Sequence, residues 1–324
     1  MKKILHFLLI SFFSFNIISC DTTTILLGAA GGGAAYWYKD DITKWYDDFS
    51  KESAAADETD ETDESDADTE QIPSLFVSVG GNGTIITSSN GTKWTRRTSG
   101  TKAKLRAVTF GNDTLVAVGF SGTIVTSSDG TVWTKSRSGT KNHLGNVTYG
   151  NDTFVAVGNS GTVITSEDGT KWTKRKSRTK AALYGVTYGN DTFVAVGNKG
   201  TIITSLDGTT WTKRKSNTSV EFNEVIHADD TFLAFGFKGV IRTSSNGKSW
   251  SKIKSGTRMG LLGATYGNGT FIAVGNAGNI ITYSGGTAWT KRKSGTKKHL
   301  RGITYGNDKF VMVGNSGTIL TSPG

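Results

Sequence analysis

Aspartates that recur at a fixed interval are the first residues of this sequence whose spacing suggests chemistry. Asp129, Asp168 and Asp207 stand 39 residues apart, each within a Ser-x-Asp-Gly phrase. A ring of such carboxylates would suit metal binding or acid chemistry. The phrase also suits a turn in which the carboxylate accepts backbone N–H bonds before a glycine at positive φ. We favour the turn, because Asn90 and Asn246 replace the aspartate in two further copies and show that the charge is dispensable.

A second candidate for chemistry is a group of acids and one histidine that departs from the other copies. The group consists of Glu221, Glu224, His227, Asp229 and Asp230. Such residues could form an acid–base or metal site. However, the two aspartates fall where a turn is expected, and the glutamates could pair with neighbouring lysines. No zinc-ligand spacing, phosphate loop or Ser/His/Asp order is present. We therefore expect no enzyme activity, metal or cofactor, and a glycosidase is the less favoured alternative.

Lysine and arginine follow the same interval and form the strongest candidate for binding. One set lies on the predicted outermost strands, such as Arg96 and Arg97, where lysine and arginine also prevent edge-to-edge pairing. A second set lies in or beside the loops that follow these strands. Cations gathered on one face would attract polyanions. The predicted binding residues are Lys102, Lys104, Arg106, Lys141, Arg178, Lys180, Arg258, Lys297, Lys298 and Arg301.

Charge is divided unevenly along the chain. Residues 75–324 contain 32 Lys and Arg against 12 Asp and Glu, whereas residues 21–74 contain 3 Lys against 15 acids. The overall net charge of +10 therefore conceals a basic domain that follows an acidic segment. We expect an acidic protein partner or an anionic polysaccharide, and no specific nucleic acid.

The elements that must position these residues are short β-strands. In residues 144–176 the predicted strands are Leu144–Tyr149, Thr153–Val157, Thr162–Ser166 and Lys171–Lys174, separated by Gly/Asn/Asp turns. Four antiparallel strands in each repeat are the content of a β-propeller blade, and helical periodicity is absent. The repeat is marked by Trp94, Trp133, Trp172, Trp211, Trp250 and Trp289, all 39 residues apart. The sequence thus predicts an all-β propeller.

Counting strands favours seven blades over six. Two of the four strands recur seven times, whereas the innermost strand and the Trp strand recur six times. Seven blades use every strand and leave a three-stranded blade at each end. Six blades remain the alternative, with the final hairpin left over.

The Trp phrase resembles the Asp-box, or BNR repeat, of sialidase-like propellers. The matching residues are Ser127, Asp129, Gly130 and Trp133 and their equivalents. The spacing from Asp to Trp is one residue shorter than usual, and looks closer to propellers of the photosystem II assembly-factor type. The resemblance covers residues 74–324 and implies a fold rather than a function. It also implies that the tryptophans pack within blades. A lectin-like carbohydrate-binding propeller, which would need exposed tryptophans, is the alternative function.

The amino-terminal residues predict an exported lipoprotein. Lys2 and Lys3 precede an apolar stretch and the sequence Ile-Ile-Ser-Cys, which resembles a bacterial lipoprotein signal peptide over residues 1–19. Cys20 is the only cysteine, so we expect it to carry the lipid anchor. An ordinary secretory signal is the alternative. We expect an anchored envelope protein, at the outer membrane or cell surface rather than the inner membrane.

Two further segments separate this anchor from the propeller of residues 74–324. Residues 20–51 contain a Gly/Ala-rich tether and a short amphipathic helix. Residues 52–73 form an acidic linker that has too few apolar residues to fold. The linker either competes for the basic face or only holds the propeller away from the membrane. The predicted protein is a monomeric binding or scaffold module attached to a membrane.

Overall fold

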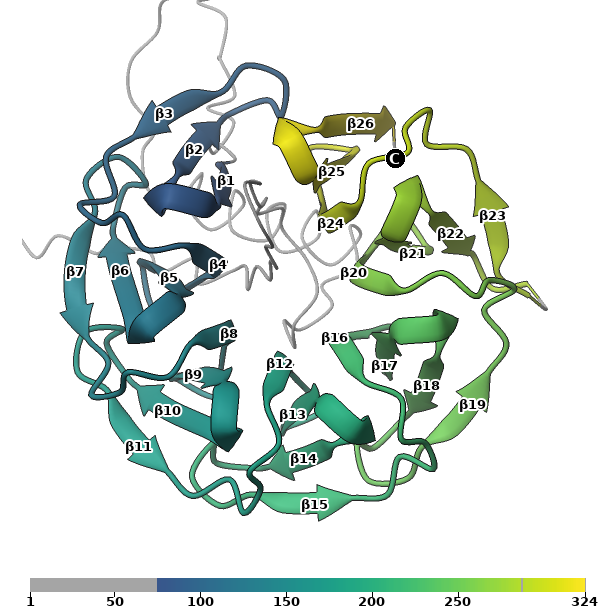
Figure 1. Ribbon diagram of the computed structural model, residues 1–324, viewed down its shortest axis with the longest axis horizontal. Coiled ribbons are helices and arrows are strands. Elements are labelled where there is room, and N and C mark those ends of the chain that lie inside the picture. Colours follow the sequence, from purple (N-terminus) through teal and green to yellow (C-terminus); the bar gives the residue numbers. More distant parts are fainter. Residues whose placement is uncertain (1–74, 287, 324) are drawn as a thin grey trace, which may run out of the picture. The chain divides into compact units, whose positions relative to one another are not determined.

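A computed structural model describes residues 75–286 and 288–323, which form a seven-bladed β-propeller (Figure 1). The predicted all-β class and the seven blades are confirmed. The predicted signal peptide, Cys20, the amphipathic helix and the acidic linker lie outside the described residues. Within the described residues, no helix is long and apolar enough to cross a membrane.

Five blades have four antiparallel strands, and the first and last have three. Blade 1 contains β1 (Phe76–Val79), β2 (Ile85–Ser88) and β3 (Thr95–Arg97); blade 2 contains β4 (Leu105–Gly111), β5 (Thr114–Gly119), β6 (Thr123–Ser127) and β7 (Thr134–Arg137). Blade 3 contains β8 (Leu144–Gly150), β9 (Thr153–Gly158), β10 (Thr162–Ser166) and β11 (Thr173–Arg175); blade 4 contains β12 (Leu183–Gly189), β13 (Thr192–Gly197), β14 (Ile202–Ser205) and β15 (Thr212–Arg214).

The remaining blades repeat this order around the ring. Blade 5 contains β16 (Phe222–Ala228), β17 (Thr231–Gly236), β18 (Ile241–Ser244) and β19 (Ser251–Ile253); blade 6 contains β20 (Leu261–Gly267), β21 (Thr270–Gly275), β22 (Ile280–Tyr283) and β23 (Thr290–Arg292); blade 7 contains β24 (Leu300–Gly306), β25 (Lys309–Gly314) and β26 (Ile319–Pro323). Short 3-10 turns link the second and third strands: η1 (Gly81–Gly83), η2 (Phe120–Gly122), η3 (Asn159–Gly161), η4 (Asn198–Gly200), η5 (Phe237–Gly239), η6 (Asn276–Gly278) and η7 (Asn315–Gly317).

Turn chemistry explains both the regular blades and the missing inner strand of blade 1. The hairpin between β4 and β5 has Asn112 and Asp113 at φ 44° and 51°, as a tight turn with two left-handed residues requires. The residue 39 positions before Asn112 is Pro73, and proline cannot adopt a positive φ. The same tight hairpin is therefore unavailable before β1.

The outermost strand begins later than the sequence predicts. In blade 3 it spans Thr173–Arg175 rather than Lys171–Lys174. The Lys171 N–H donates to Asp168 Oδ1 at 2.9 Å, and Trp172 Nε1 donates to Gly169 O at 2.8 Å. These bonds keep both residues in the preceding turn, so the strand starts only after the tryptophan.

The hydrophobic core is a series of layers between neighbouring blades. One layer combines Val155 and Val157 of blade 3 with Leu183, Phe193 and Trp211 of blade 4. Phe76 of blade 1 packs with Val311 and Val313 of blade 7 in the layer that closes the ring. Blades 1 and 7 lie side by side in Figure 1, in separate sheets that share no strand.

A hydrogen bond shows that this closing contact repeats an ordinary interface between blades. Asn112 Nδ2 donates to Glu167 O, and Asn190 Nδ2 donates to Ser245 O, each 55 residues ahead. The equivalent Asn307 Nδ2 donates to Ser89 O at 3.1 Å, 218 residues behind. Seven periods of 39 residues bring the chain round to this partner, so blades 1 and 7 are in register.

Candidate functional site

The propeller has two faces with different connections. The acidic face is formed by the hairpins between first and second strands and by the Trp-containing turns between third and fourth strands. The basic face is formed by the 3-10 turns and by the loops that lead from each outermost strand to the next blade. Because β1 is a second strand and β26 is a third strand, β1 begins and β26 ends on the acidic face.

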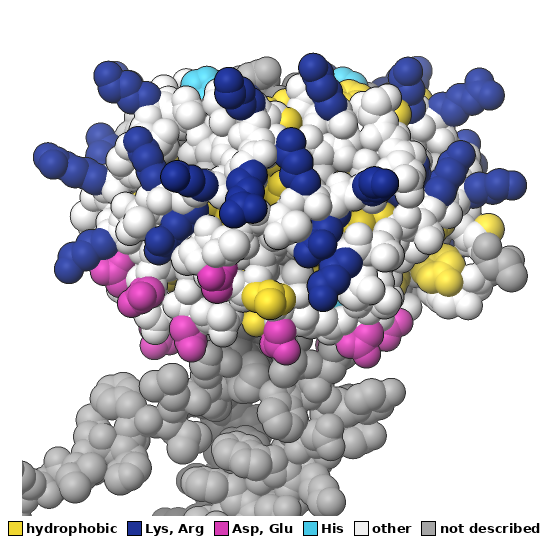
Figure 2. Space-filling view, turned by 90° about the horizontal axis from the view of Figure 1, so that it is seen from below, with side chains coloured by type: hydrophobic (Ala, Val, Ile, Leu, Met, Phe, Trp, Pro, Cys, Tyr) yellow, Lys and Arg dark blue, Asp and Glu magenta, His cyan; other side chains and the backbone are white. Residues whose placement is uncertain are grey.

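Negative charge gathers on the acidic face. Ten of the 12 Asp and Glu residues in 75–324 lie in its turns: Asp113, Asp129, Asp152, Glu167, Asp168, Asp191, Asp207, Asp229, Asp230 and Asp308. Figure 2 shows them along the lower side of the propeller, with Lys and Arg on the outer wall and the upper side. Only Glu221 and the buried Glu224 lie elsewhere. The molecule is therefore charged in opposite senses on its two faces.

The structure brings the predicted loop cations together on the basic face. The side chains of Lys102, Lys141, Arg178, Lys180, Arg258, Lys297 and Lys298 are all exposed there. Lys104, Arg106 and Arg301 differ, because each is half-buried at the start of an innermost strand. The prediction thus combined two sets of residues, one in the loops and one beside the central channel.

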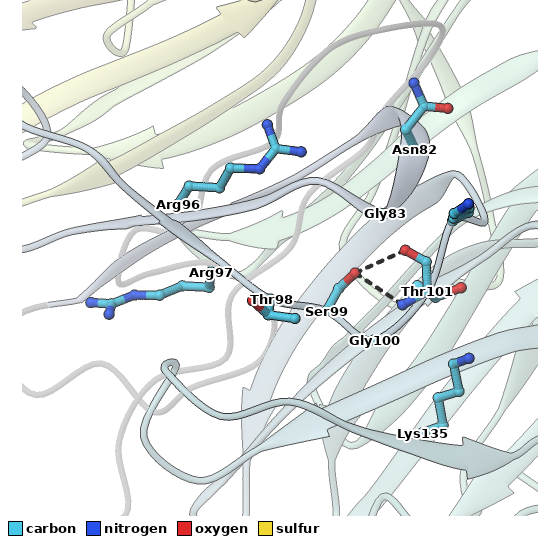
Figure 3. Close-up of a pocket in the computed structure, with 10 residues that line it drawn as sticks. Asn82, Gly83, Arg96, Arg97, Thr98, Ser99, Gly100, Thr101 and Lys135 are labelled. Carbon is cyan, nitrogen blue, oxygen red and sulfur yellow. Dashed lines mark hydrogen bonds between the residues drawn. The ribbon is translucent and has the colours of Figure 1, made fainter.

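The loop cations line shallow grooves that recur from blade to blade. A groove of about 600 Å³ is lined by Arg96, Arg97, Lys102 and, from the next blade, Lys135 (Figure 3). Its equivalent 39 residues on has a volume of about 580 Å³ and includes Arg137, Lys141 and Lys174. In the first groove, Ser99 Oγ donates to Thr101 O and accepts from the Thr101 N–H, which fixes the loop between these cations.

Arg178 occupies a backbone position that glycine takes in four other loops. Its φ is 58°, whereas the equivalent Gly100 has φ 67°. A side chain other than glycine is disfavoured in this left-handed region. The loop nevertheless carries an exposed guanidinium there, beside Lys180.

The residues beside the channel sit at a shared β-bulge. The pairing register shifts between Leu105 and Ala107, which leaves Arg106 at the bulge; Tyr184 and Arg301 occupy the same position in blades 4 and 7. Arg301 Nε donates to Asn315 Oδ1 at 3.0 Å. Burial raises the pKa of Tyr184, and the Glu221 carboxylate also raises it while Arg106 lowers it. These groups therefore influence one another electrostatically near the channel.

Several cations on the outermost strands have structural partners that the sequence analysis missed. Nε donates to a threonine hydroxyl on the adjacent strand at 2.8–3.0 Å in four pairs: Arg97–Thr87, Arg175–Thr165, Arg214–Thr204 and Arg292–Thr282. These arginines join the third and fourth strands of their blades. The exposed lysines beside them remain available for binding.

Arg242 is a second structural cation that sequence analysis did not identify. It lies in β18, where blade 4 has Ile203, and its side chain is 6% exposed. Nε donates to Ser216 O at 2.8 Å and Nη2 donates to Asn217 O at 3.0 Å. The guanidinium therefore fastens blade 5 to the loop that leaves blade 4. The signal in the sequence was an arginine in a column of aliphatic residues.

The repeated aspartates serve the turns in which they lie. Asp129 Oδ1 accepts from the N–H groups of Thr131 and Val132 at 2.8 and 3.1 Å. The hydrogen bond from the Thr131 hydroxyl, followed by these backbone bonds, holds the Asp129 pKa well below its usual range. Asn90 Oδ1 accepts the equivalent bonds from Thr92 and Lys93. The carboxylate is therefore a turn acceptor, and the amide performs the same task.

The tryptophans lie against the blades. Trp211 is fully buried, and Trp133, Trp250 and Trp289 are 5–7% exposed. Trp94 and Trp172 are half-buried. Each indole Nε1 in the first five copies donates to the carbonyl of the turn glycine. This packing leaves little indole surface for stacking on a sugar.

The structure does not bring the Glu/His group together. Glu224 and His227 are three residues apart on β16, so their side chains leave opposite faces of the strand. Asp229 and Asp230 lie in the following hairpin at φ 48° and 50°. Within residues 75–286 and 288–323, no group of three or more His, Cys, Asp or Glu side chains could hold a metal ion.

Comparisons with known proteins agree with the fold. A family model described as the DUF6242 beta propeller domain matches residues 104–220. No curated protein matches the chain. Among solved structures, YCF48 bound to D1 peptide is 19% identical with a TM-score of 0.64, over 77% of this chain and 88% of that chain.

Two other solved propellers are similar at comparable levels. YCF48 from Cyanidioschyzon merolae is 17% identical with a TM-score of 0.62, over 76% of this chain and 91% of that chain. The WD40 beta propeller domain of Doa1 is 12% identical with a TM-score of 0.62, over 76% and 88%. At these identities the likeness establishes the class of protein, a β-propeller, and its fold alone.

Proposed function

We propose that this protein is a lipid-anchored scaffold of the bacterial cell envelope whose basic face binds an acidic segment of a partner polypeptide. The observation that carries the proposal is the separation of charge by face. Cations from successive blades project from one side of the ring, whereas ten acids lie on the other. Such a surface attracts an anionic partner and fixes which side of the propeller it approaches.

The form of the basic face favours a polypeptide. Its grooves are shallow and recur in adjacent blades, so an extended acidic segment could occupy several of them at once. Weak sites that are occupied together gain affinity through their proximity. The similarity to a YCF48 structure that contains a D1 peptide adds support for a peptide ligand. The packed tryptophans make a lectin-like role the weaker alternative.

The proposed anchor would leave the basic face unobstructed. Residue 75 precedes β1, which begins on the acidic face, so a tether from Cys20 would join the propeller on that side. The acidic run of residues 52–70 would then meet carboxylates of the same sign. The basic face would point away from the membrane and toward its partner.

The binding proposal can be tested with two charge variants of equal size. In the first, the basic-face residues Arg178, Lys180, Lys297 and Lys298 are replaced by Gln. In the control, four cations in or beside the acidic-face turns, Lys93, Lys171, Lys248 and Lys309, are replaced by Gln. Poly-L-glutamate and heparin serve as polypeptide and polysaccharide probes for the full chain, with affinities measured across a salt series.

We expect only the basic-face variant to lose affinity for poly-L-glutamate. Four exposed charge pairs are together worth about 1–4 kcal/mol, and the difference should shrink as salt screens the charges. Equal losses in both variants would contradict recognition by one face. Preference for heparin over poly-L-glutamate would favour the polysaccharide alternative.

The anchor requires a separate experiment. Cys20→Ser should release the protein from the membrane fraction while leaving its thermal unfolding unchanged, because the cysteine lies outside the propeller. Retention of the variant on membranes after a high-salt wash would refute lipid attachment through Cys20.

A further inference from the structure

The basic face contains a stacked pair of rings between blades 2 and 3. Phe120 of η2 lies parallel to His143, with ring centroids 4.1 Å apart and an interplanar angle of 15°. His143 Nδ1 accepts a hydrogen bond from the backbone N–H of Ser121 at 2.9 Å. Lys104 Nζ and Arg106 Cζ also lie 5.2 and 5.8 Å from the centroid of the Phe120 ring. One phenylalanine thus holds an imidazole and two cations, and it is half-buried.

The same arrangement recurs between blades 5 and 6 without the imidazole. Phe237 of η5 is the equivalent of Phe120, but the residue equivalent to His143 is Gly260. A Cβ at Gly260 would lie 3.4 Å from Phe237 Cδ1, so this glycine borders the ring. Lys238 is the equivalent of Ser121, and its N–H has no acceptor within the described residues. The position that His143 fills is therefore open, with a stacking surface and a hydrogen-bond donor in place.

The cations that cover Phe120 are also missing around Phe237. Glu221 stands at the position of Lys104, and Asn223 stands at the position of Arg106. Asn223 Nδ2 donates instead to Leu261 O at 2.8 Å. Phe237 is consequently 41% exposed, and Met259, the residue before Gly260, is 40% exposed. These two form an apolar site on a face that is otherwise polar and basic.

We propose that this open position binds the imidazole ring of a histidine in the partner polypeptide. The ring stacks on Phe237, and its Nδ1 accepts from the Lys238 N–H, as His143 does from Ser121. A phenyl, indole or pyrrole ring could stack but has no ring nitrogen to accept this bond, and a guanidinium group has donors only. The proposal rests on the proposed function, since it names one side chain of the polypeptide that the basic face binds.

The methionines provide a direct measurement. Apart from Met1, the chain contains Met259 beside the site and Met312, which is 5% exposed within blade 7. With ¹³C-methyl methionine in the full chain, imidazole should shift the Met259 methyl resonance in a saturable manner and leave Met312 unchanged. Pyrrole at the same concentration is the matched probe, because it has the same ring size without the acceptor nitrogen.

Two variants test the site itself. Phe237→Ala removes the stacking surface, so the response to imidazole should be lost. Gly260→His should fill the position from within the chain, as His143 does opposite Phe120, and should also abolish the response. The new Cβ would lie 2.8 Å from Asn276 Nδ2, but the equivalent Asn159 accommodates His143 in blade 3. A Met259 shift caused by the added imidazole would confirm that Gly260→His is correctly folded.

The outcomes separate this inference from the proposed function. The basic-face variant of Arg178, Lys180, Lys297 and Lys298 should lose affinity for poly-L-glutamate and keep its full response to imidazole. No shift of Met259 in the unmodified protein, an equal response to pyrrole, or a response that persists in Gly260→His would overturn the proposed histidine site. None of these three results would affect binding of an acidic segment to the loop cations.

Discussion

Replacement of Trp211 tests whether the repeated tryptophans hold the blades together. Trp211 is fully buried between blades 3 and 4, and its Nε1 donates to Gly208 O at 2.8 Å. Trp211→Ala should lower the free energy of unfolding by about 3–5 kcal/mol, the usual cost of emptying a large aromatic site. Trp211→Phe retains most of the packing but leaves the Gly208 carbonyl without its donor. That variant should lose about 1–3 kcal/mol.

Trp172 supplies the matched comparison, because it occupies the same place in its turn but is only half-buried. Trp172→Ala should therefore cost less than Trp211→Ala. Urea unfolding followed by far-UV circular dichroism measures both, with the slope of the transition reporting any change in the unfolded state. An equal loss in the two alanine variants, or no loss in Trp211→Ala, would refute burial as the source of the stabilisation.

Three further replacements should have distinct effects. Burial raises the Glu224 pKa well above its usual value of about 4.3, so the folded protein should lose stability as the pH rises from that value toward the raised pKa. Thermal unfolding across this range should show a flatter profile and a higher midpoint near pH 7 in Glu224→Gln. Arg242→Ile copies Ile203 of blade 4 but leaves the Ser216 carbonyl without its donor, and urea unfolding should show a loss of about 1–3 kcal/mol. Arg178→Gly relieves a positive φ and should gain about 1 kcal/mol in urea unfolding, while poly-L-glutamate binding weakens.

The fold could be predicted from the sequence because its determinants are local and repeated. Pairs such as Asn112 and Asp113 identify the tight hairpins directly, and the interval between tryptophans gives the length of a blade. The strand inventory also favoured seven blades. The start of the outermost strand was less predictable, because it depends on the hydrogen bonds that Lys171 and Trp172 make within the turn.

The candidate site was predictable only where position in the repeat determines exposure. Lys102 and Lys180 lie in loops without insertions, and both are exposed on the basic face. The partner of Arg242 could not be inferred, because Ser216 belongs to another blade and lies 26 residues away in the chain. The stacking of Phe120 on His143 likewise joins two blades, and it becomes visible only when their relative positions are known.

The way the ring closes has a consequence for its internal motion. Blades 1 and 7 have separate sheets, so their contact depends on side chains such as Phe76 and Val311 and on the bond from Asn307 to Ser89. Ser78 replaces the alanine of the interior blades in this layer, and its buried hydroxyl has no partner within the described residues. In a chain of repeats, an interface that lacks covalent continuity and contains an unpaired polar group is the first to separate. Backbone amides of β1 and β26 should therefore exchange hydrogen for deuterium faster than those of their equivalents in blades 3 and 4, through opening of the ring at this interface.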